Sequence, residues 1–344
     1  MIASPNPSRV GSGRWWAPVA LVLFMMPGGV VSLSGESGDK APGAAEVTAV
    51  DTIVVFPKAD GLQDWSDAQG LSSPAQVVAA ERVLVVLDQA TSTVWVLDRG
   101  SGEASHFGRR GEGPGEFRGL GRAMVYGDTI WVSGVGNSRI SVWHDSELVA
   151  EQRMDRPSAH GEFLVVDDLG VLTPEPQTSP ELLRLPAESN RVPPREQMGE
   201  TPFPLDLLAY DGSRIAVFEN SAARLVTFDP SSPAPSAGEA RIPEAIVEEI
   251  DDRIRTFQAD RGGGTPAQYG RDLQSMGEDA WLLTLVRPTE ACVIGMVLSP
   301  DRDPVHIAVP CDESTRDHFP FTSITPDGDC FVAGHALGVS RWCP

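Results

Sequence analysis

The sequence predicts an all-β fold, a six-bladed β-propeller, from three observations: a recurring pair of apolar strand segments, a near-constant repeat length and many turn residues. Glycine and proline occur 34 and 29 times, and they separate short apolar runs. Six copies of the strand pair follow one another along the chain. The central residues of their first strands are Val85, Trp131, Leu172, Ala216, Leu282 and Phe331.

The spacing of these copies predicts one blade per copy. The central residues are separated by 46, 41, 44, 66 and 49 residues. Since a four-stranded blade takes about 40 to 50 residues, the fourth interval must contain an insertion of about 20 residues. An innermost strand is expected ahead of each pair, over residues 74–80, 121–126, 161–167, 204–210, 271–276 and 320–326.

The two ends of the sequence predict how the ring closes. Pro344 directly follows the third strand of the sixth copy, and an unassigned strand pattern stands at Asp51–Phe56. An open sheet edge would leave backbone groups unpaired. We therefore expect Asp51–Phe56 to supply the missing fourth strand of the last blade.

Residues 1–34 are typical of an export signal. Arg9 and Arg14 precede an apolar run at Ala17–Met26. This run is shorter than the about 20 residues of a membrane-spanning helix. We expect cleavage after Ser34, and the alternative is a signal that is kept as an anchor.

The mature chain is expected to consist of a linker over residues 35–47 and a single propeller domain over residues 48–344. We expect it to be periplasmic or extracellular, monomeric and without a membrane segment. Its 27 basic residues are outnumbered by 48 acidic residues, which gives the whole chain a net charge of −21. Because phosphate backbones are bound by clustered cations, this balance argues against a nucleic-acid partner.

Residues 107–143 carry the most specific pattern. They begin with Phe107–Phe117 (FGRRGEGPGEF), followed by Ile130–Val132 and Asn137–Ile140. This order resembles an NHL-type repeat and, more closely, the six-bladed β-propeller proteins that bacteria export. The resemblance implies the same propeller fold for this chain.

The glycine-rich segment contains the binding candidates. Gly108–Gly115 joins two strand patterns and lacks the lysine and the following helix of a phosphate-binding loop, so we interpret it as a crossing between blades. Arg109, Arg110, Glu116 and, from a nearby loop, Arg139 are candidates for ligand contact. The alternatives are a solvated loop for the first three and ion pairing between neighbouring blades for Arg139.

The insertion between the fourth and fifth copies predicts a helix at about residues 243–262. Pro243 suits the first turn of a helix, and three glycines follow its expected end. The strand order of a propeller places this helix on the same face as the crossing at Gly108. Two roles remain open for this helix: it plugs that face, or it serves as a lid or docking element. Apolar residues recur at helical spacing at Ile246, Ile250, Ile254 and Phe257.

The four cysteines predict two disulfide bonds, because their number is even and the chain is expected to be exported. Placing Leu298 opposite Val305 in one hairpin sets Cys292 opposite Cys311. In the last blade, Cys330 and Cys343 face each other in the same way. Directly opposed residues on antiparallel strands lie near the distance that a disulfide needs.

No catalytic set, metal site or cofactor is predicted. The chain lacks a Gly-x-Ser-x-Gly elbow, and its 6 histidines lack the spacing of zinc ligands. We favour an exported binding or scaffolding module for a protein, peptide or glycan ligand. The alternative is a hydrolase or lyase of the gluconolactonase or amidating-lyase type, which needs polar side chains that converge on the central channel.

Overall fold

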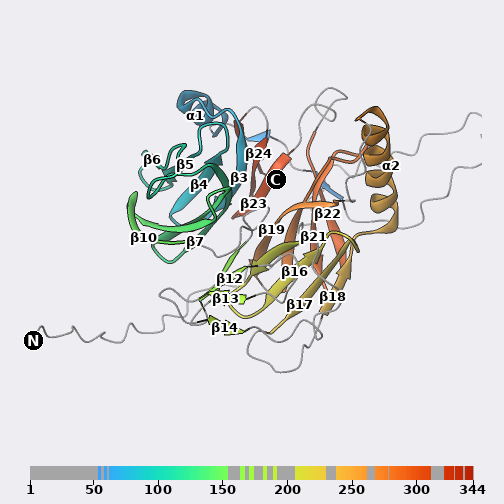
Figure 1. Ribbon diagram of the computed structural model, residues 1–344. Helices are drawn as coiled ribbons and strands as arrows, with labels where there is room; N and C mark the ends of the chain where they lie inside the picture. The colour runs from blue at the N-terminus through green and yellow to red at the C-terminus, as the bar shows by residue number, and fades with distance from the viewer. Residues whose placement is uncertain are drawn as a thin grey trace, which may run out of the picture. The chain divides into compact units, whose positions relative to one another are not determined.

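In the computed structural model, all of the described helices and strands lie within Val50–Pro344 (Figure 1). The predicted export signal and linker lie outside the described residues. These residues are 53–55, 58–59, 62–153, 163–166, 170–173, 181–183, 189–191, 206–229, 238–261, 268–277, 279–310, 321–328, 330–335 and 338–343.

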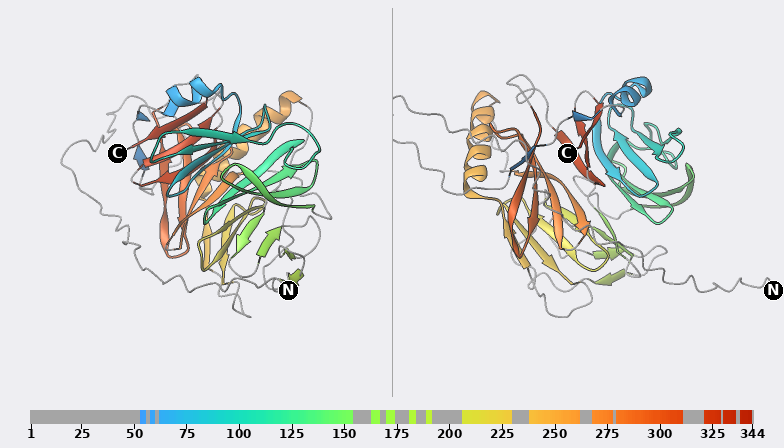
Figure 2. Two further views of the ribbon diagram at one scale, coloured as in Figure 1. Left: turned by 90° about the vertical axis from the view of Figure 1, so that its left-hand side faces the viewer. Right: turned by 180° about the vertical axis from the view of Figure 1, so that it is seen from behind.

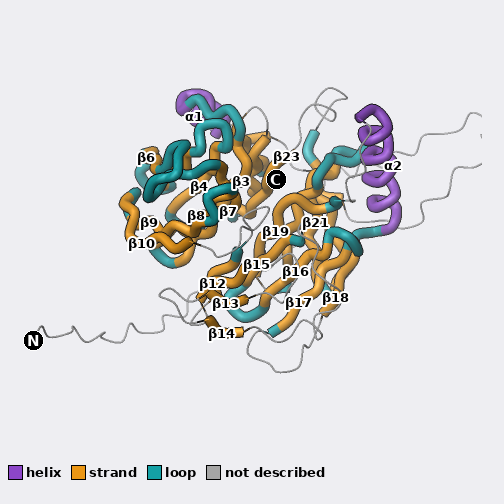
Figure 3. Tube along the Cα trace, in the orientation of Figure 1, coloured by secondary structure: helices purple, strands orange, loops and turns teal. Residues whose placement is uncertain are grey.

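Most described secondary structure is β-strand (Figure 3). The described strands form six sheets, which we number in chain order. Sheet one contains β3 (Pro74–Ala79), β4 (Val83–Asp88), β5 (Thr93–Asp98) and β6 (Ala104–Phe107). Sheet two contains β7 (Gly119–Tyr126), β8 (Thr129–Val135), β9 (Arg139–His144) and β10 (Glu147–Arg153). Sheet three contains β11 (Leu164–Val166), β12 (Gly170–Thr173), β13 (Glu181–Leu183) and β14 (Ser189–Arg191).

The other three sheets repeat this antiparallel order, and two of them also take a strand from the start of the described chain. Sheet four contains β15 (Leu207–Tyr210), β16 (Ile215–Glu219), β17 (Arg224–Phe228) and β18 (Gly238–Arg241). Sheet five contains β19 (Gly270–Gly277), β20 (Ala280–Leu285), β21 (Val293–Ser299), β22 (Arg302–Ala308) and β1 (Ile53–Val55). Sheet six contains β23 (Phe321–Asp327), β24 (Cys330–His335), β25 (Gly338–Trp342) and β2 (Lys58–Ala59).

The predicted strand pairs form because each copy is an apolar run flanked by turn residues. In β4, every residue from Leu84 to Asp88 is buried, since both faces of this sheet are covered. The tight turns after the first strands use glycine at positive φ, for example Gly127 at 56° and Gly328 at 62°. These elements match the innermost strands and strand pairs that the sequence predicts.

The first strands contact one another in cyclic order, from β3 through β7, β11, β15, β19 and β23 back to β3. Figure 2 shows the sheets following one another around a centre in chain order. Buried apolar clusters lie between neighbouring sheets, and in one of them Phe117 and Trp143 pack with Val85. The predicted all-β propeller class is therefore confirmed. Five sheets have extensively described side chains, whereas the strands of sheet three are described mainly through their backbone.

The prediction for the closing strand is wrong in detail. Ile53–Val55, within the segment expected to complete the last blade, instead pairs in parallel with β22 at the edge of sheet five. Sheet six is completed by β2, in which Lys58 lies opposite Trp342. An apolar strand can cover any free sheet edge, so the strand pattern alone does not choose between these two edges.

One predicted disulfide bond is confirmed. Cys330 and Cys343 are bonded, with 4.2 Å between their Cα atoms. They continue the register in which Phe331 lies opposite Trp342.

For the other predicted pair, Cys292 is also disulfide-bonded. Its predicted partner, Cys311, lies outside the described residues, so this pairing stays a prediction. The predicted hairpin register is wrong by one residue. Val305 lies opposite Val297, because the β21–β22 pairing contains two register shifts.

The predicted insertion is helical. α2 (Glu244–Arg261) lies between sheets four and five in the chain. Ile250 is 1% exposed, and it packs with Ile246 and Tyr269 in the cluster shared by these sheets. The side chains of Ile254 and Phe257 lie outside those described. A further helix, α1 (Leu62–Gln69), was not predicted and connects β2 to β3.

Candidate ligand-binding face

One end of the sheets carries all the features that the sequence singled out for binding. Strand direction alternates from the first to the fourth strand of each sheet, so connections from second to third strands emerge at the same end as connections from one sheet to the next. We call this end the loop face. It carries residues 89–92, 108–118, 136–138, 220–223 and 286–292, together with α1 and α2.

The crossing at residues 108–118 has a fixed backbone. Phe117 N–H donates to the carbonyl of Arg109 at 2.8 Å, and Gly111 N–H donates to the carbonyl of Phe117 at 3.1 Å. The Phe117 side chain is fully buried between sheets one and two. Gly115 has a φ of 69°, and a Cβ atom there would lie 2.8 Å from the Trp143 ring. The segment is therefore a structural crossing, with glycine where a side chain would clash.

Glu116 fixes the turn inside this crossing. Its Oε2 accepts a hydrogen bond from Gly113 N–H at 2.8 Å, and its Oε1 accepts one from Arg109 Nε at 2.8 Å. The Gly113 N–H, followed by the Arg109 guanidinium, lowers the pKa of Glu116. Two sequence candidates, Arg109 and Glu116, therefore pair with each other. Because the Arg109 side chain is 79% exposed, it also remains open to solvent.

Arg139 attaches the crossing to sheet two. Its Nη1 donates to the carbonyl of Gly113 at 2.9 Å and to Oε2 of Glu151 at 3.0 Å. Glu151 also accepts a hydrogen bond from Gly115 N–H at 3.0 Å. Arg139 thus positions the loop rather than facing a ligand directly. Glu151 lies on β10, far from the glycine-rich motif in sequence, so no sequence pattern around it indicated this role.

Arg110 differs from its neighbours. It is exposed at the crossing, and among the described residues its side chain makes no hydrogen bond or ion pair. The third exposed arginine of the loop, Arg118, pairs with Glu112. The structure thus brings the four sequence candidates to one loop system and leaves the Arg110 guanidinium available.

Amide side chains on the loop face hold neighbouring sheets together. Oε1 of Gln89 in sheet one accepts a hydrogen bond from Leu120 N–H in sheet two at 2.9 Å. Oδ1 of Asn220 accepts from Tyr269 N–H at 2.9 Å and from Gly270 N–H at 2.8 Å, joining sheets four and five. These bonds fix the positions of the loops relative to one another.

A cluster of polar side chains from the first strands fills part of the centre. Asp272 Oδ2 accepts hydrogen bonds from Ser323 Oγ and from Gln274 Nε2, and its Oδ1 lies 4.0 Å from Nη2 of Arg122. Gln76 Nε2 donates to Oδ1 of Asp272. The carboxyl and guanidinium groups are 6% and 5% exposed. This ion pair is therefore an internal connection between sheets rather than an open site.

Sequence comparisons give no family for the chain: no protein-family model and no curated protein matches it. Its fold is similar to that of a Bacteroides fragilis protein described as a candidate exported protein. The TM-score is 0.50 at 11% identity, over 85% of this chain and 99% of that one. A streptogramin B lyase structure covers 77% of both chains with a TM-score of 0.48 and 10% identity. At such identities the likeness concerns the fold alone.

No group of three or more histidine, cysteine, aspartate or glutamate side chains within the described ranges is arranged to hold a metal ion. None of the helices in this part of the chain is long and apolar enough to cross a membrane.

We expect Tyr269, at the loop face, to show a measurable response to pH. Burial, followed by its hydrogen bond to Asp251 on α2, raises the pKa of Tyr269 from 10.0 to about 12. Because the folded state favours the neutral phenol, its contribution to stability is full below pH 10.0 and is lost as the pH rises to about 12. Tyrosinate absorbance should show a component titrating near pH 12 that Tyr269→Phe removes. A variant with an unchanged titration curve would contradict this assignment.

Proposed function

We propose that the chain is an exported, monomeric binding or scaffolding module that takes a protein, peptide or glycan ligand on its loop face. The observation that carries this proposal is the crossing at 108–118. Carboxylates and backbone groups fix Arg109 and Arg139, while the exposed Arg110 guanidinium stays available. A loop whose backbone is already fixed loses little backbone freedom when its arginine binds, and the planar guanidinium presents paired donors to a carboxylate or hydroxyl group, which favours recognition.

Export is part of this proposal. The disulfide between Cys330 and Cys343 supports it, because such bonds persist in oxidising compartments outside the cytosol. The similar fold of the Bacteroides fragilis protein described as a candidate exported protein is in accord with it. We also propose cleavage of the signal near Ser34, before a propeller domain that starts near residue 48.

The proposed ring has six blades, one for each sheet. The cyclic contacts of the first strands support this number. So do the buried clusters between sheets, including Ile140, Phe163 and Val165 between sheets two and three and Leu164 with Leu208 between sheets three and four. Sheet three thus joins its neighbours through the same kind of core as the others.

The polar cluster at Asp272 favours a second candidate, a hydrolase or lyase with a site at the channel. Several polar side chains do converge there, as that function requires. However, the cluster is buried, and its carboxylate already accepts hydrogen bonds from Ser323, Gln274 and Gln76. We therefore propose binding on the loop face ahead of catalysis in the channel.

The test uses Arg110 and a matched control. Purified chain lacking residues 1–34 is screened on glycan and peptide arrays, and bound members are titrated with Arg110→Ala and with Arg82→Ala. Arg82 is exposed at the opposite end of the sheets. Losing a charge-assisted contact should weaken binding about tenfold or more in Arg110→Ala, and Arg82→Ala should bind like the wild type. Equal binding by both variants, or no bound array member, would contradict the proposal.

A further inference from the structure

Two arginines stand together at the loop-face end of sheet five. Gly270 lies opposite Leu285 and Asp272 opposite Thr284, so Arg271 is the extra residue of a bulge in the first strand. Bulges redirect the side chain of the inserted residue. Arg287 follows β20, and the bond from Val286 N–H to the Tyr269 carbonyl keeps the two strands paired up to it. The backbone therefore holds both guanidinium groups at the same end of the sheet.

The surroundings of Arg271 are those of a recessed cation. Its side chain is exposed to water. Burial nevertheless lowers the pKa of Arg271, and the positive charge of Arg287 lowers it further. A group that water reaches and that protein also desolvates lies in a recess. Two cations held there repel each other, and a bound anion would relieve this repulsion.

The described acids near this end are engaged by other groups. Oδ2 of Asp272 accepts from Ser323 and Gln274. Asp251 accepts from the Tyr269 hydroxyl at 3.0 Å, and Glu249 accepts from the backbone N–H of Glu290. These carboxylates are therefore committed to holding α2 and the centre of the ring.

We propose that Arg271 and Arg287 form a binding site for a small oxyanion on the loop face. Guanidinium groups present paired N–H donors that match carboxylate and phosphate oxygens, so both kinds of anion share the required chemistry. The inference goes beyond the proposed function, because it concerns a small anion and does not involve Arg110.

Calorimetric titration of the chain lacking residues 1–34 tests the site, with inorganic phosphate and citrate as separate probes at constant ionic strength in chloride buffer. At least one probe should bind the wild type, and Arg271→Ala should weaken that binding about tenfold or more. The matched control is Arg302→Ala, an exposed arginine at the other end of sheet five, which should bind like the wild type. Phosphate binding alone would assign a tetrahedral anion, and citrate binding alone a carboxylate.

Side-chain NMR provides a readout that does not depend on a variant. The Nε–H signals of Arg271 and Arg287 in the wild type should shift on adding the bound probe. No binding of either probe, equal affinity of Arg271→Ala and the wild type, or unmoved arginine signals would overturn the site. Because Arg110 takes no part, Arg110→Ala should bind the small anion normally, so failure here is distinguishable from failure of the proposed function.

Discussion

Replacing Ile250 by aspartate should destabilise the protein by about 4 kcal/mol or more, or detach α2 from the sheets. Ile250 is 1% exposed within the core of sheets four and five, so the variant loses apolar burial and forces a carboxylate into the same space. Since α2 also holds Tyr269 through Asp251, its detachment should return the Tyr269 pKa toward the ordinary tyrosine value. Chemical denaturation and tyrosinate absorbance measure the two effects.

The matched control is Glu248→Ala on the exposed side of the same helix. It keeps the helix and loses no buried contact, so its unfolding free energy should stay within about 0.5 kcal/mol of the wild type. Ile250→Asp and Glu248→Ala of equal stability would show that α2 does not pack on the sheets.

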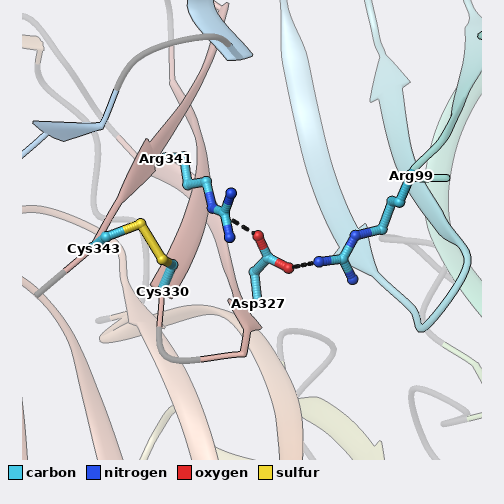
Figure 4. The surroundings of a disulfide bond; sticks show 5 residues. All are labelled: Arg99, Asp327, Cys330, Arg341 and Cys343. Carbon is cyan, nitrogen blue, oxygen red and sulfur yellow. Dashed lines mark hydrogen bonds and ion pairs between the residues drawn. A yellow bond between two sulfur atoms is a disulfide. The ribbon is translucent and has the colours of Figure 1, made fainter. Parts of the chain in front are cut away.

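Replacing Asp327 by alanine should have the second-largest effect, at the junction of sheets one and six. The Asp327 carboxylate is 6% exposed, and it pairs with Arg99 of sheet one and with Arg341 of β25 (Figure 4). We expect a loss of about 2–3 kcal/mol. This is less than the about 3–5 kcal/mol of a fully buried pair, because both arginines retain partial access to water.

Denaturation under non-reducing conditions measures this loss, so that the nearby Cys330–Cys343 bond stays intact in every variant. Asp128→Ala serves as the control, because Asp128 is 76% exposed and pairs with Arg82 only at 4.0 Å. That variant should lose less than about 1 kcal/mol. A similar small loss in Asp327→Ala would mean that the pair with Arg99 does not hold the two sheets together.

Local sequence patterns were sufficient to predict the repeated strands, because each apolar run is bounded by turn residues and spaced by a blade length. The glycine crossing was predictable for the same reason. The sheet edge that Ile53–Val55 covers could not be predicted in this way. Which edge the strand pairs with depends on which free sheet edge lies within its reach in the folded chain. β2 has 2 residues, too few to form a recognisable strand pattern.

The central polar cluster shows a second limit of prediction from the sequence. Arg122 donates to the carbonyl of Leu273, a residue 151 positions away. Gln76 and Ser323 come from two further sheets and meet Asp272 only after the sheets assemble. None of these side chains stands out in its own segment, whereas the four binding candidates lie in or beside one motif. Polar side chains that meet from several sheets therefore form no local pattern in the sequence.

Hydrogen exchange at four backbone amides tests the closed ring most directly. Ala123, Gly270, Ile324 and Ala79 lie in first strands, and each amide donates to a side chain of the neighbouring sheet: Gln76, Asn220, Thr284 and Thr325. The Ala79 bond joins sheet six to sheet one. A closed ring predicts slow exchange at all four amides, with comparable protection. Unprotected exchange at Ala79, with the other three protected, would show that the ring is open between its first and last sheets.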